Sequence, residues 1–154
     1  MSIDIKFRVW DKTSDSMLYQ DDFERVEIDT KNKMVTLIAE EESDKSHYVL
    51  DYEDGIEAEI MRYTGLKDKN GKEIYEKDIV KVTINNKTFN AWIVFEMGSF
   101  MIANDDITYY IDDNWNDNVK CLSELAWEQE EFEDRIYCLE VIGDTYQNID
   151  LIEV

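Results

Sequence analysis

The first third of the chain is a series of short apolar runs separated by polar turns. Between residues 3 and 9 every second side chain is apolar, and Trp10 follows on the opposite face. A period of two is typical of a half-buried strand. Similar runs occur at residues 17–19, 26–28, 34–38 and 47–50. Runs this short, joined by turns this short, predict an antiparallel meander with a hairpin loop at residues 29–33.

The middle of the chain continues this pattern. Apolar spacing over residues 51–59 is helical, but Gly55 interrupts it, so we predict a short turn and then a strand. Further strands are predicted at residues 78–84, 89–95, 100–103 and 107–111. Asn85-Asn86 and Gly98 supply turn residues that tolerate positive φ.

One helix is predicted near residues 123–134. Ser123 is its expected N-cap, and Leu122 with Trp127 would form a hydrophobic staple across that cap. The expected apolar stripe consists of Leu125, Phe132 and Ile136, and the outer face is acidic. After the helix we predict a strand at residues 136–141, a turn at residues 141–144 and a closing strand at residues 151–152.

Together these elements predict a mainly β fold, α+β at most. We expect a small antiparallel barrel or curled sheet with one short helix, and residues 75–103 resemble the strand pattern of an SH3-like barrel. At 154 residues the chain is expected to form a single domain, 1–154, that buries about two-thirds of its unfolded surface. It contains no proline, so every strand keeps its backbone donors.

Residues 61–82 hold two of the five glycines, and the run Asp68-Lys69-Asn70-Gly71 has turn chemistry. A short acidic side chain can bond its own backbone, and Asn and Gly follow where φ is positive. The segment reads Tyr63-Thr64-Gly65-Leu66-x-Asp68-x-x-Gly71-x-x-Ile74-Tyr75-Glu76-x-Asp78-Ile79-Val80. This block resembles the signature of the YopX family of small phage and prophage proteins.

Two further pieces carry the same resemblance. They are Ile5-Lys6-Phe7-Arg8-Val9-Trp10-Asp11 near the start and Val141-Ile142-Gly143-Asp144-Thr145-Tyr146-Gln147-Asn148 near the end. One departure is Lys77, because the family usually has Gly before the Asp that enters the next strand. The resemblance implies a phage or prophage setting and no stated activity.

Charge is the strongest compositional feature. The net charge is −21, with 37 acidic and 16 basic side chains. A surface this negative repels nucleic acid phosphates and anionic lipid headgroups, so we predict no direct nucleic acid or membrane partner. The excess acid favours a protein partner with a basic surface. We assign partner binding to five acids: Asp112, Asp117, Glu128, Glu131 and Asp134.

Residues 61–81 are an exception, because they carry more basic than acidic side chains. This basic island suggests an alternative: binding of a small anionic ligand such as a nucleotide, or of the acidic flank of a second copy in a homo-oligomer. Its candidate residues are Arg62, Lys67, Lys69 and Lys72. Lysines along a strand also protect a sheet edge from aggregation.

No metal, cofactor or catalytic set is predicted. Asp112, Asn114 and Asn116 match the first ligand positions of a calcium-binding loop, but Asp117 stands where Gly is needed and Ser123 where Glu belongs. Cys121, Cys138 and His47 lack zinc-ligand spacing. We therefore expect a protein that is not an enzyme.

Location follows from two absences in the sequence. No apolar run approaches the roughly 20 residues that cross a bilayer, and the first residues lack a signal-peptide pattern. We expect the bacterial cytoplasm, with both cysteines reduced. Our hypothesis is a non-enzymatic phage or prophage accessory protein that binds a host or phage protein. In its sharper form, the acidic surface imitates nucleic acid and serves as an anti-defence factor.

Overall fold

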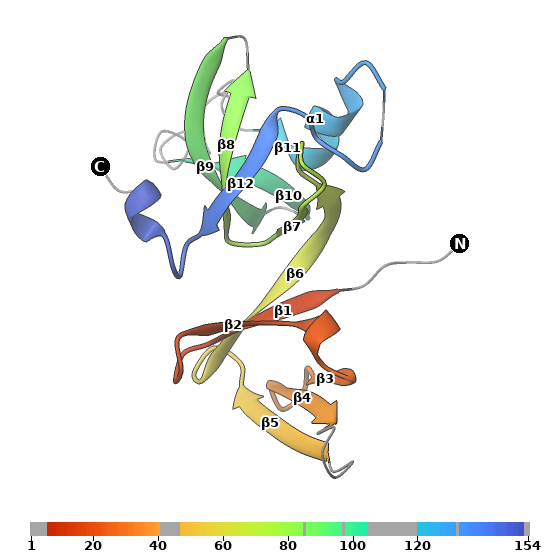
Figure 1. Ribbon diagram of the computed structural model, residues 1–154, viewed down its shortest axis with the longest axis vertical. Coiled ribbons are helices and arrows are strands. Elements are labelled where there is room, and N and C mark those ends of the chain that lie inside the picture. The colour runs from red at the N-terminus through yellow and green to blue at the C-terminus, as the bar shows by residue number, and fades with distance from the viewer. Residues whose placement is uncertain are drawn as a thin grey trace. The chain divides into compact units, whose positions relative to one another are not determined.

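The computed structural model describes residues 6–40, 47–84, 86–96, 98–104, 120–131 and 133–152. It is mostly β, with one short α-helix among these residues, so the predicted fold class is confirmed. The chain groups into two compact units, Met1–Arg62 (unit 1) and Tyr63–Val154 (unit 2). Figure 1 colours unit 1 from red to yellow and unit 2 from yellow-green to blue. The single-domain assignment stays a prediction.

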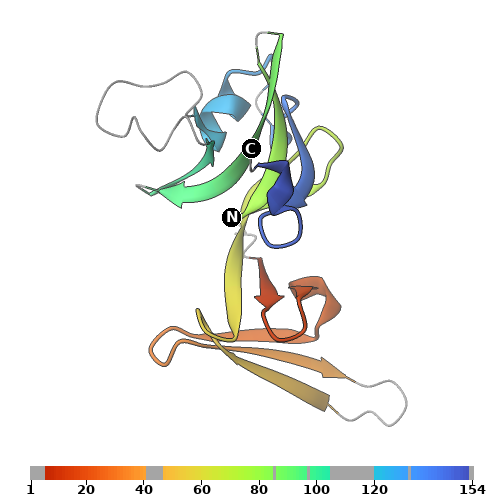
Figure 2. The same cartoon turned by 90° about the vertical axis from the view of Figure 1, so that its left-hand side faces the viewer.

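Unit 1 consists of two antiparallel groups of strands. Its elements are β1 (Phe7–Asp11), β2 (Ser16–Tyr19), the 3-10 helix η1 (Gln20–Asp22), β3 (Arg25–Asp29), β4 (Met34–Glu40), β5 (His47–Glu53) and the first half of β6 (Ala58–Lys67). Strand β1 lies between β2 and β6, whereas β3, β4 and β5 form a separate sheet in that order. Figure 2 shows β4 and β5 side by side along their length, as their register requires.

The core of unit 1 follows the predicted alternation. Val9, Val35, Leu37, Tyr52 and Ala58 form one buried cluster. The opposite face of β1 is covered as well, because Arg8 is 3% and Trp10 is 7% exposed. An alternating pattern identifies the strand, but it does not show that the polar face of that strand is buried too.

The predicted turns of unit 1 are present. Asp29 Oδ1 accepts the backbone N–H groups of Lys31 and Asn32, each at 3.1 Å, which closes the hairpin at residues 29–33. Residues 55–57 form a turn, with Gly55 at φ +86°, and β6 follows it. The interruption of the helical spacing by glycine was therefore the decisive local signal.

Unit 2 is built on a curled antiparallel sheet. After β7 (Glu73–Tyr75), which pairs with the second half of β6, come β8 (Asp78–Ile84), β9 (Lys87–Glu96), β10 (Ser99–Ala103), β11 (Lys120–Cys121), α1 (Leu122–Trp127), β12 (Leu139–Asp144) and the 3-10 helix η2 (Ile149–Leu151). The strand order is β11-β10-β9-β8-β12. The strands predicted at residues 78–84, 89–95 and 100–103 are present as β8, β9 and β10.

One face of this sheet holds the core of unit 2. Its buried members include Ile74, Val80, Val82, Ile93, Ile102 and Leu139. Helix α1 adds Leu122, Leu125 and Ala126 to the same cluster. No helix in the described part of the chain is long and apolar enough to cross a membrane.

The helix is shorter than predicted. It begins at Leu122 and ends at Trp127, and its N-cap is Cys121 without a side-chain capping bond, so Ser123 is not the cap. The expected staple is also wrong, because Leu122 is 1% exposed and Trp127 is 73% exposed. Continuing the helix to residue 134 would stack like charges such as Glu130 and Asp134 at i, i+4, which disfavours it. Ile136 joins the core from outside the helix, and Phe132 lies outside the described residues.

The C-terminal segment also differs from the prediction. Strand β12 begins at Leu139, after a turn, and continues through residues 141–144 with a bulge between Val141 and Gly143. The turn comes after Asp144, and residue 151 ends η2 instead of a strand. Elsewhere, Asn86 and Gly98 take the expected positive φ values of 63° and 78°. The strand predicted at 107–111 lies outside the described residues.

Candidate partner-binding surface

Four buried aspartates stand in the three sequence pieces that resemble a family signature. Asp11, Asp68, Asp78 and Asp144 are 8%, 1%, 2% and 5% exposed. A buried carboxylate is costly unless its oxygens are hydrogen-bonded, so the partners of each one determine its role.

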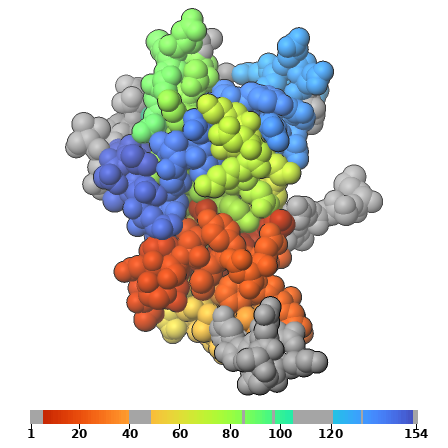
Figure 3. Space-filling view, viewed as in Figure 1, coloured from red at the N-terminus to blue at the C-terminus, as the bar shows by residue number. Residues whose placement is uncertain are grey.

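Asp68 ties the predicted turn to the last strand of the sheet. Its Oδ1 accepts the backbone N–H groups of Asn70 and Lys72, both at 2.9 Å, and its Oδ2 accepts the Val141 N–H at 2.9 Å. The Lys69 N–H also donates to the Leu139 carbonyl at 2.9 Å. Figure 3 shows this yellow-green segment beside the blue β12 on the surface of unit 2. The predicted turn chemistry is therefore present, with an added long-range bond.

Gly71 completes that turn. Its φ is +81°, and a Cβ at this position would lie 2.8 Å from Arg135 Nη2. A side chain would therefore meet both backbone strain and the guanidinium of Arg135. The positive φ is the reason that the turn needs glycine, because the Arg135 guanidinium ends a flexible side chain that can move aside.

Asp78 and Asp144 organise the next two turns in the same way. Asp78 Oδ2 accepts the Tyr75 N–H at 2.8 Å. Asp144 Oδ1 accepts the N–H groups of Tyr146 and Gln147, both at 2.9 Å. Between Tyr75 and Asp78, Lys77 has φ +71°, a conformation that favours glycine. The departure at Lys77 keeps the turn and places a lysine in a glycine conformation.

Asp11 closes the first turn of unit 1. It accepts bonds from the Thr13 N–H (2.8 Å), the Ser14 hydroxyl (2.8 Å) and the Tyr52 hydroxyl (2.9 Å). Burial raises the pKa of Asp11, but the bonds from Ser14, Tyr52 and Thr13 outweigh this effect and lower the pKa below its ordinary value of 3.8. The bonds within the turn and the bond from Tyr52 therefore favour the ionised carboxylate.

These contacts give the four aspartates a structural role. Each carboxylate accepts backbone N–H groups of a turn, and an oxygen used in this way is not presented to a substrate. Within the described residues, no three His, Cys, Asp or Glu side chains gather to hold a metal ion. The motif residues therefore explain how the chain turns, and a binding surface must be sought elsewhere.

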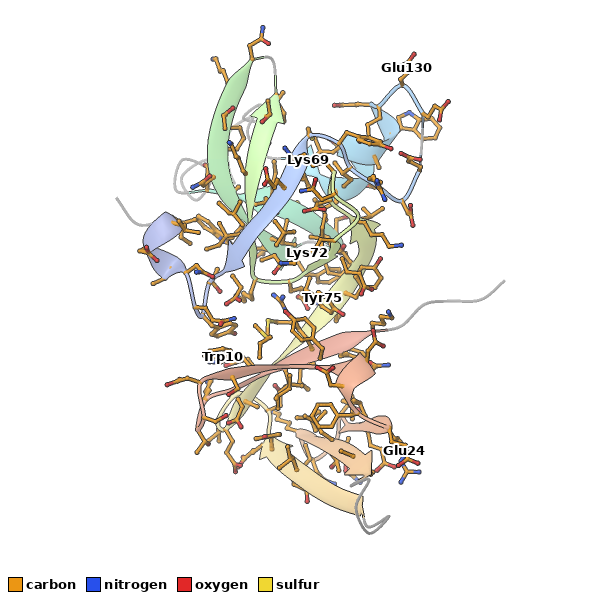
Figure 4. All side chains as sticks on the ribbon, in the orientation of Figure 1. Trp10, Glu24, Lys69, Lys72, Tyr75 and Glu130 are labelled. Carbon is orange, nitrogen blue, oxygen red and sulfur yellow. The ribbon has the colours of Figure 1, made fainter. Side chains whose placement is uncertain are left out.

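Two lysines of the basic island, Lys67 and Lys69, are paired with acids of the same unit. Lys67 Nζ lies 3.7 Å from Asp134 Oδ2, and Lys69 Nζ lies 3.1 Å from Glu140 Oε2. Lys69 and Lys72, labelled in Figure 4, both belong to the segment beside β12, and Lys72 is exposed. Arg62 is the last residue of unit 1 and is half-buried. The structure thus brings Lys67 and Lys69 to carboxylates of the C-terminal segment.

The predicted acidic residues divide into two groups. Glu128, Glu131 and Asp134 are exposed on the connection between α1 and β12, whereas Asp112 and Asp117 lie outside the described residues. Residues 122–137 contain six acids and one base, Arg135. Figure 4 shows Glu130 at the tip of this connection, pointing away from the ribbon. The exposed acids among the predicted residues therefore lie together on one described segment of unit 2.

Comparisons with known proteins agree with the family resemblance of the three sequence pieces. The model of the family described as YopX protein matches residues 6–153. The chain belongs to the YopX family. Among solved structures, protein yopX from Bacillus subtilis is similar, with 25% identity and a TM-score of 0.65, covering 96% of this chain and 98% of that one. Protein EF1440 from Enterococcus faecalis has 25% identity and a TM-score of 0.56, covering 99% of this chain and 100% of that one. No curated protein matches the chain.

In this YopX-family chain, sequence reasoning missed an exposed aromatic pair in the acidic connection. Trp127 is 73% and Tyr137 is 54% exposed. A hydrogen bond to Glu133, together with partial burial and the charge of that carboxylate, raises the pKa of Tyr137 above 10.0. Tyr137 was placed in a predicted strand and Trp127 in a predicted staple, and both assignments implied burial. Two large aromatic residues within a run of acids were the available signal.

Proposed function

We propose that this YopX-family protein is a non-enzymatic phage or prophage accessory protein of the bacterial cytoplasm that binds a host or phage protein with a basic surface. The observation that carries this proposal is the run of exposed acids after α1, which includes Glu128, Glu131 and Asp134. A concentrated negative surface steers a positive partner and accelerates its association.

The sharper form of the proposal is imitation of nucleic acid. A partner that binds DNA presents a basic cleft, and a protein of net charge −21 can compete for that cleft through the same long-range attraction. Binding would then weaken with added salt and be displaced by duplex DNA. An anti-defence role would follow if the captured partner acts on phage DNA.

The contacts of the basic island favour this proposal over ligand sequestration. Lys67 and Lys69 already lie beside Asp134 and Glu140, so an anionic ligand at these lysines would meet nearby carboxylates. Exposed ion pairs contribute only about 0–1 kcal/mol each, so the pairs themselves would be easy to displace. The repulsion by those carboxylates is the stronger objection, and no described contact favours the ligand.

Affinity capture from host lysate, followed by mass spectrometry, would identify the partner. The purified pair is then compared with Glu128→Lys/Glu131→Lys, which leaves the Lys67–Asp134 contact intact. The matched control is Glu24→Lys/Glu57→Lys, which makes the same charge change at exposed positions of unit 1. We expect slower association for the first variant only, a steep salt dependence, and displacement by duplex DNA.

The opposing outcomes are equally specific. If the Glu128/Glu131 variant binds like the parent at low and high salt, the acidic connection is not the binding surface. The ligand alternative replaces this proposal if two results are found together. Lys69→Glu/Lys72→Glu abolishes binding of a nucleotide ligand, and Glu128→Lys/Glu131→Lys leaves binding unchanged.

A further inference from the structure

Exposed aromatic side chains stand out on the acidic connection of unit 2. Trp127 at the end of α1 and Tyr137 before β12 are 73% and 54% exposed. A tryptophan buries roughly 150–250 Å² when covered, so leaving it in water forgoes a large stabilisation. Trp and Tyr are also enriched among the residues that dominate binding energy at interfaces.

Hydrogen bonds of Gln129 close the loop that leads to Tyr137, and Trp127 precedes this loop at the end of α1. The Gln129 side chain spans this loop: its Nε2 donates to the Arg135 carbonyl at 2.9 Å, and its Oε1 accepts the Tyr137 N–H at 2.6 Å. Nε2 also lies 3.4 Å from the Ala126 carbonyl, next to Trp127. One half-buried amide thus bonds to the backbone beside both rings. A surface organised before binding loses less entropy when a partner arrives.

The charges around the rings define the partner. Glu128, Glu130 and Glu131 follow Trp127 and are all exposed, and Glu133 contacts Tyr137. Aromatic faces attract cations, and a guanidinium can stack on a ring while its N–H groups bond carboxylates. An anionic membrane, a nucleic acid or a second copy with net charge −21 would be repelled by the same acids.

We propose that Trp127, Tyr137 and the surrounding carboxylates form a docking surface for an arginine-bearing segment of a partner protein. This inference rests on the proposed function and makes it more specific. The acids supply long-range attraction, whereas the rings supply contact energy and a preference for arginine over lysine. A surface that relied on charge alone would show no such preference.

A pair of defined peptides tests this preference without knowledge of the partner. One peptide alternates four arginines with glycine, and the other has lysine at the same four positions. Isothermal titration calorimetry at low and moderate salt compares the parent protein with Trp127→Ala, Trp127→Phe and Ile56→Ala. Ile56 is an exposed apolar residue of unit 1 and serves as the matched control, at 65% exposure.

We expect the arginine peptide to bind the parent several-fold more tightly than the lysine peptide. Trp127→Ala should weaken the arginine peptide by about tenfold and remove the difference between the peptides, because a cation–π contact is lost. Trp127→Phe should restore part of the binding, and Ile56→Ala should have no effect. Circular dichroism checks that each variant is folded.

Two results would overturn the inference and separate it from the proposed function. Equal binding of both peptides to the parent and to Trp127→Ala would show that charge alone acts, which leaves the proposed function standing. No binding of either peptide to the parent would also reject the docking surface. The proposed function is then judged by whether the Glu128/Glu131 variant associates with the captured protein more slowly than the parent does.

Discussion

Replacing Asp68 by alanine removes the acceptor that joins the signature turn to β12. Asp68 is 1% exposed, and its two oxygens accept three backbone N–H groups, from Asn70, Lys72 and Val141. Alanine keeps the backbone conformation within reach but leaves all three donors without this acceptor. The change therefore tests the assignment of the motif aspartates to structure.

The expected cost follows from the surroundings of the three donors. A hydrogen bond to a charged group contributes about 1.5–3 kcal/mol to stability. The residues Asn70 and Lys72 are exposed, so water can replace part of their bonds, whereas Val141 is half-buried in a paired strand. We expect Asp68→Ala to lower the free energy of unfolding by about 3–5 kcal/mol, a large part of the 5–15 kcal/mol typical of a domain.

Urea unfolding followed by circular dichroism measures this cost. Asp68→Asn should lose about 2 kcal/mol, because one oxygen remains while the amide N–H₂ faces a donor. Glu140→Ala is the control, since it removes only an exposed ion pair with Lys69 and should cost within about 1 kcal/mol. A loss below about 0.5 kcal/mol for Asp68→Ala would refute the reasoning, because surface changes give values of that size.

Three further outcomes follow from the same structure. Lys77→Gly should raise the urea midpoint, because relief of about 1–2 kcal/mol of left-handed strain exceeds the roughly 0.4–1 kcal/mol of added unfolded-state entropy; a lower midpoint would contradict this. Because the pKa of Asp11 is lowered in the folded state, its contribution to stability is present above pH 3.8 and is lost as pH falls through the folded value. Asp11→Asn should therefore be less stable at neutral pH and lose less stability on acidification than the parent, whereas parallel pH curves would reject the assignment. Finally, the melting temperature should rise with added salt, because carboxylates repel one another over a screening length of about 8–10 Å at physiological ionic strength; a salt-independent melting temperature would count against this.

Strand positions were predictable because local signals and tertiary structure agreed. Val9, Val80 and Val82 are buried as the alternation predicts, although the other faces of β1 and of the start of β8 are buried as well. The Asp68 turn carries its own backbone bonds. The helix boundary was not predictable in the same way. A helical pattern of apolar residues suggested 123–134, but repulsion among acids and the Gln129 bonds to Arg135 and Tyr137 end α1 at Trp127.

The candidate surface shows a different limit of sequence reasoning. Composition indicated acidic residues, and exposure of Glu128, Glu131 and Asp134 agrees with that expectation. The ion pairs of Lys67 and Lys69 join segments far apart in the chain, so no local pattern could reveal them. Exposure of Trp127 was equally hidden, because a large aromatic residue beside an apolar stripe indicates burial.

The pairing of strand β6 has a consequence for how the protein folds during its synthesis on the ribosome. Its residues 58–62 complete the pairing of β1, whereas its later residues pair with β7. Unit 1 therefore has all its strands once residue 62 has emerged. Unit 2 must wait for β12, because Val141 reaches back 73 residues to Asp68. Domains fold as units during synthesis, so nascent chains stalled before residue 139 should protect unit 1 from protease while unit 2 is still cleaved.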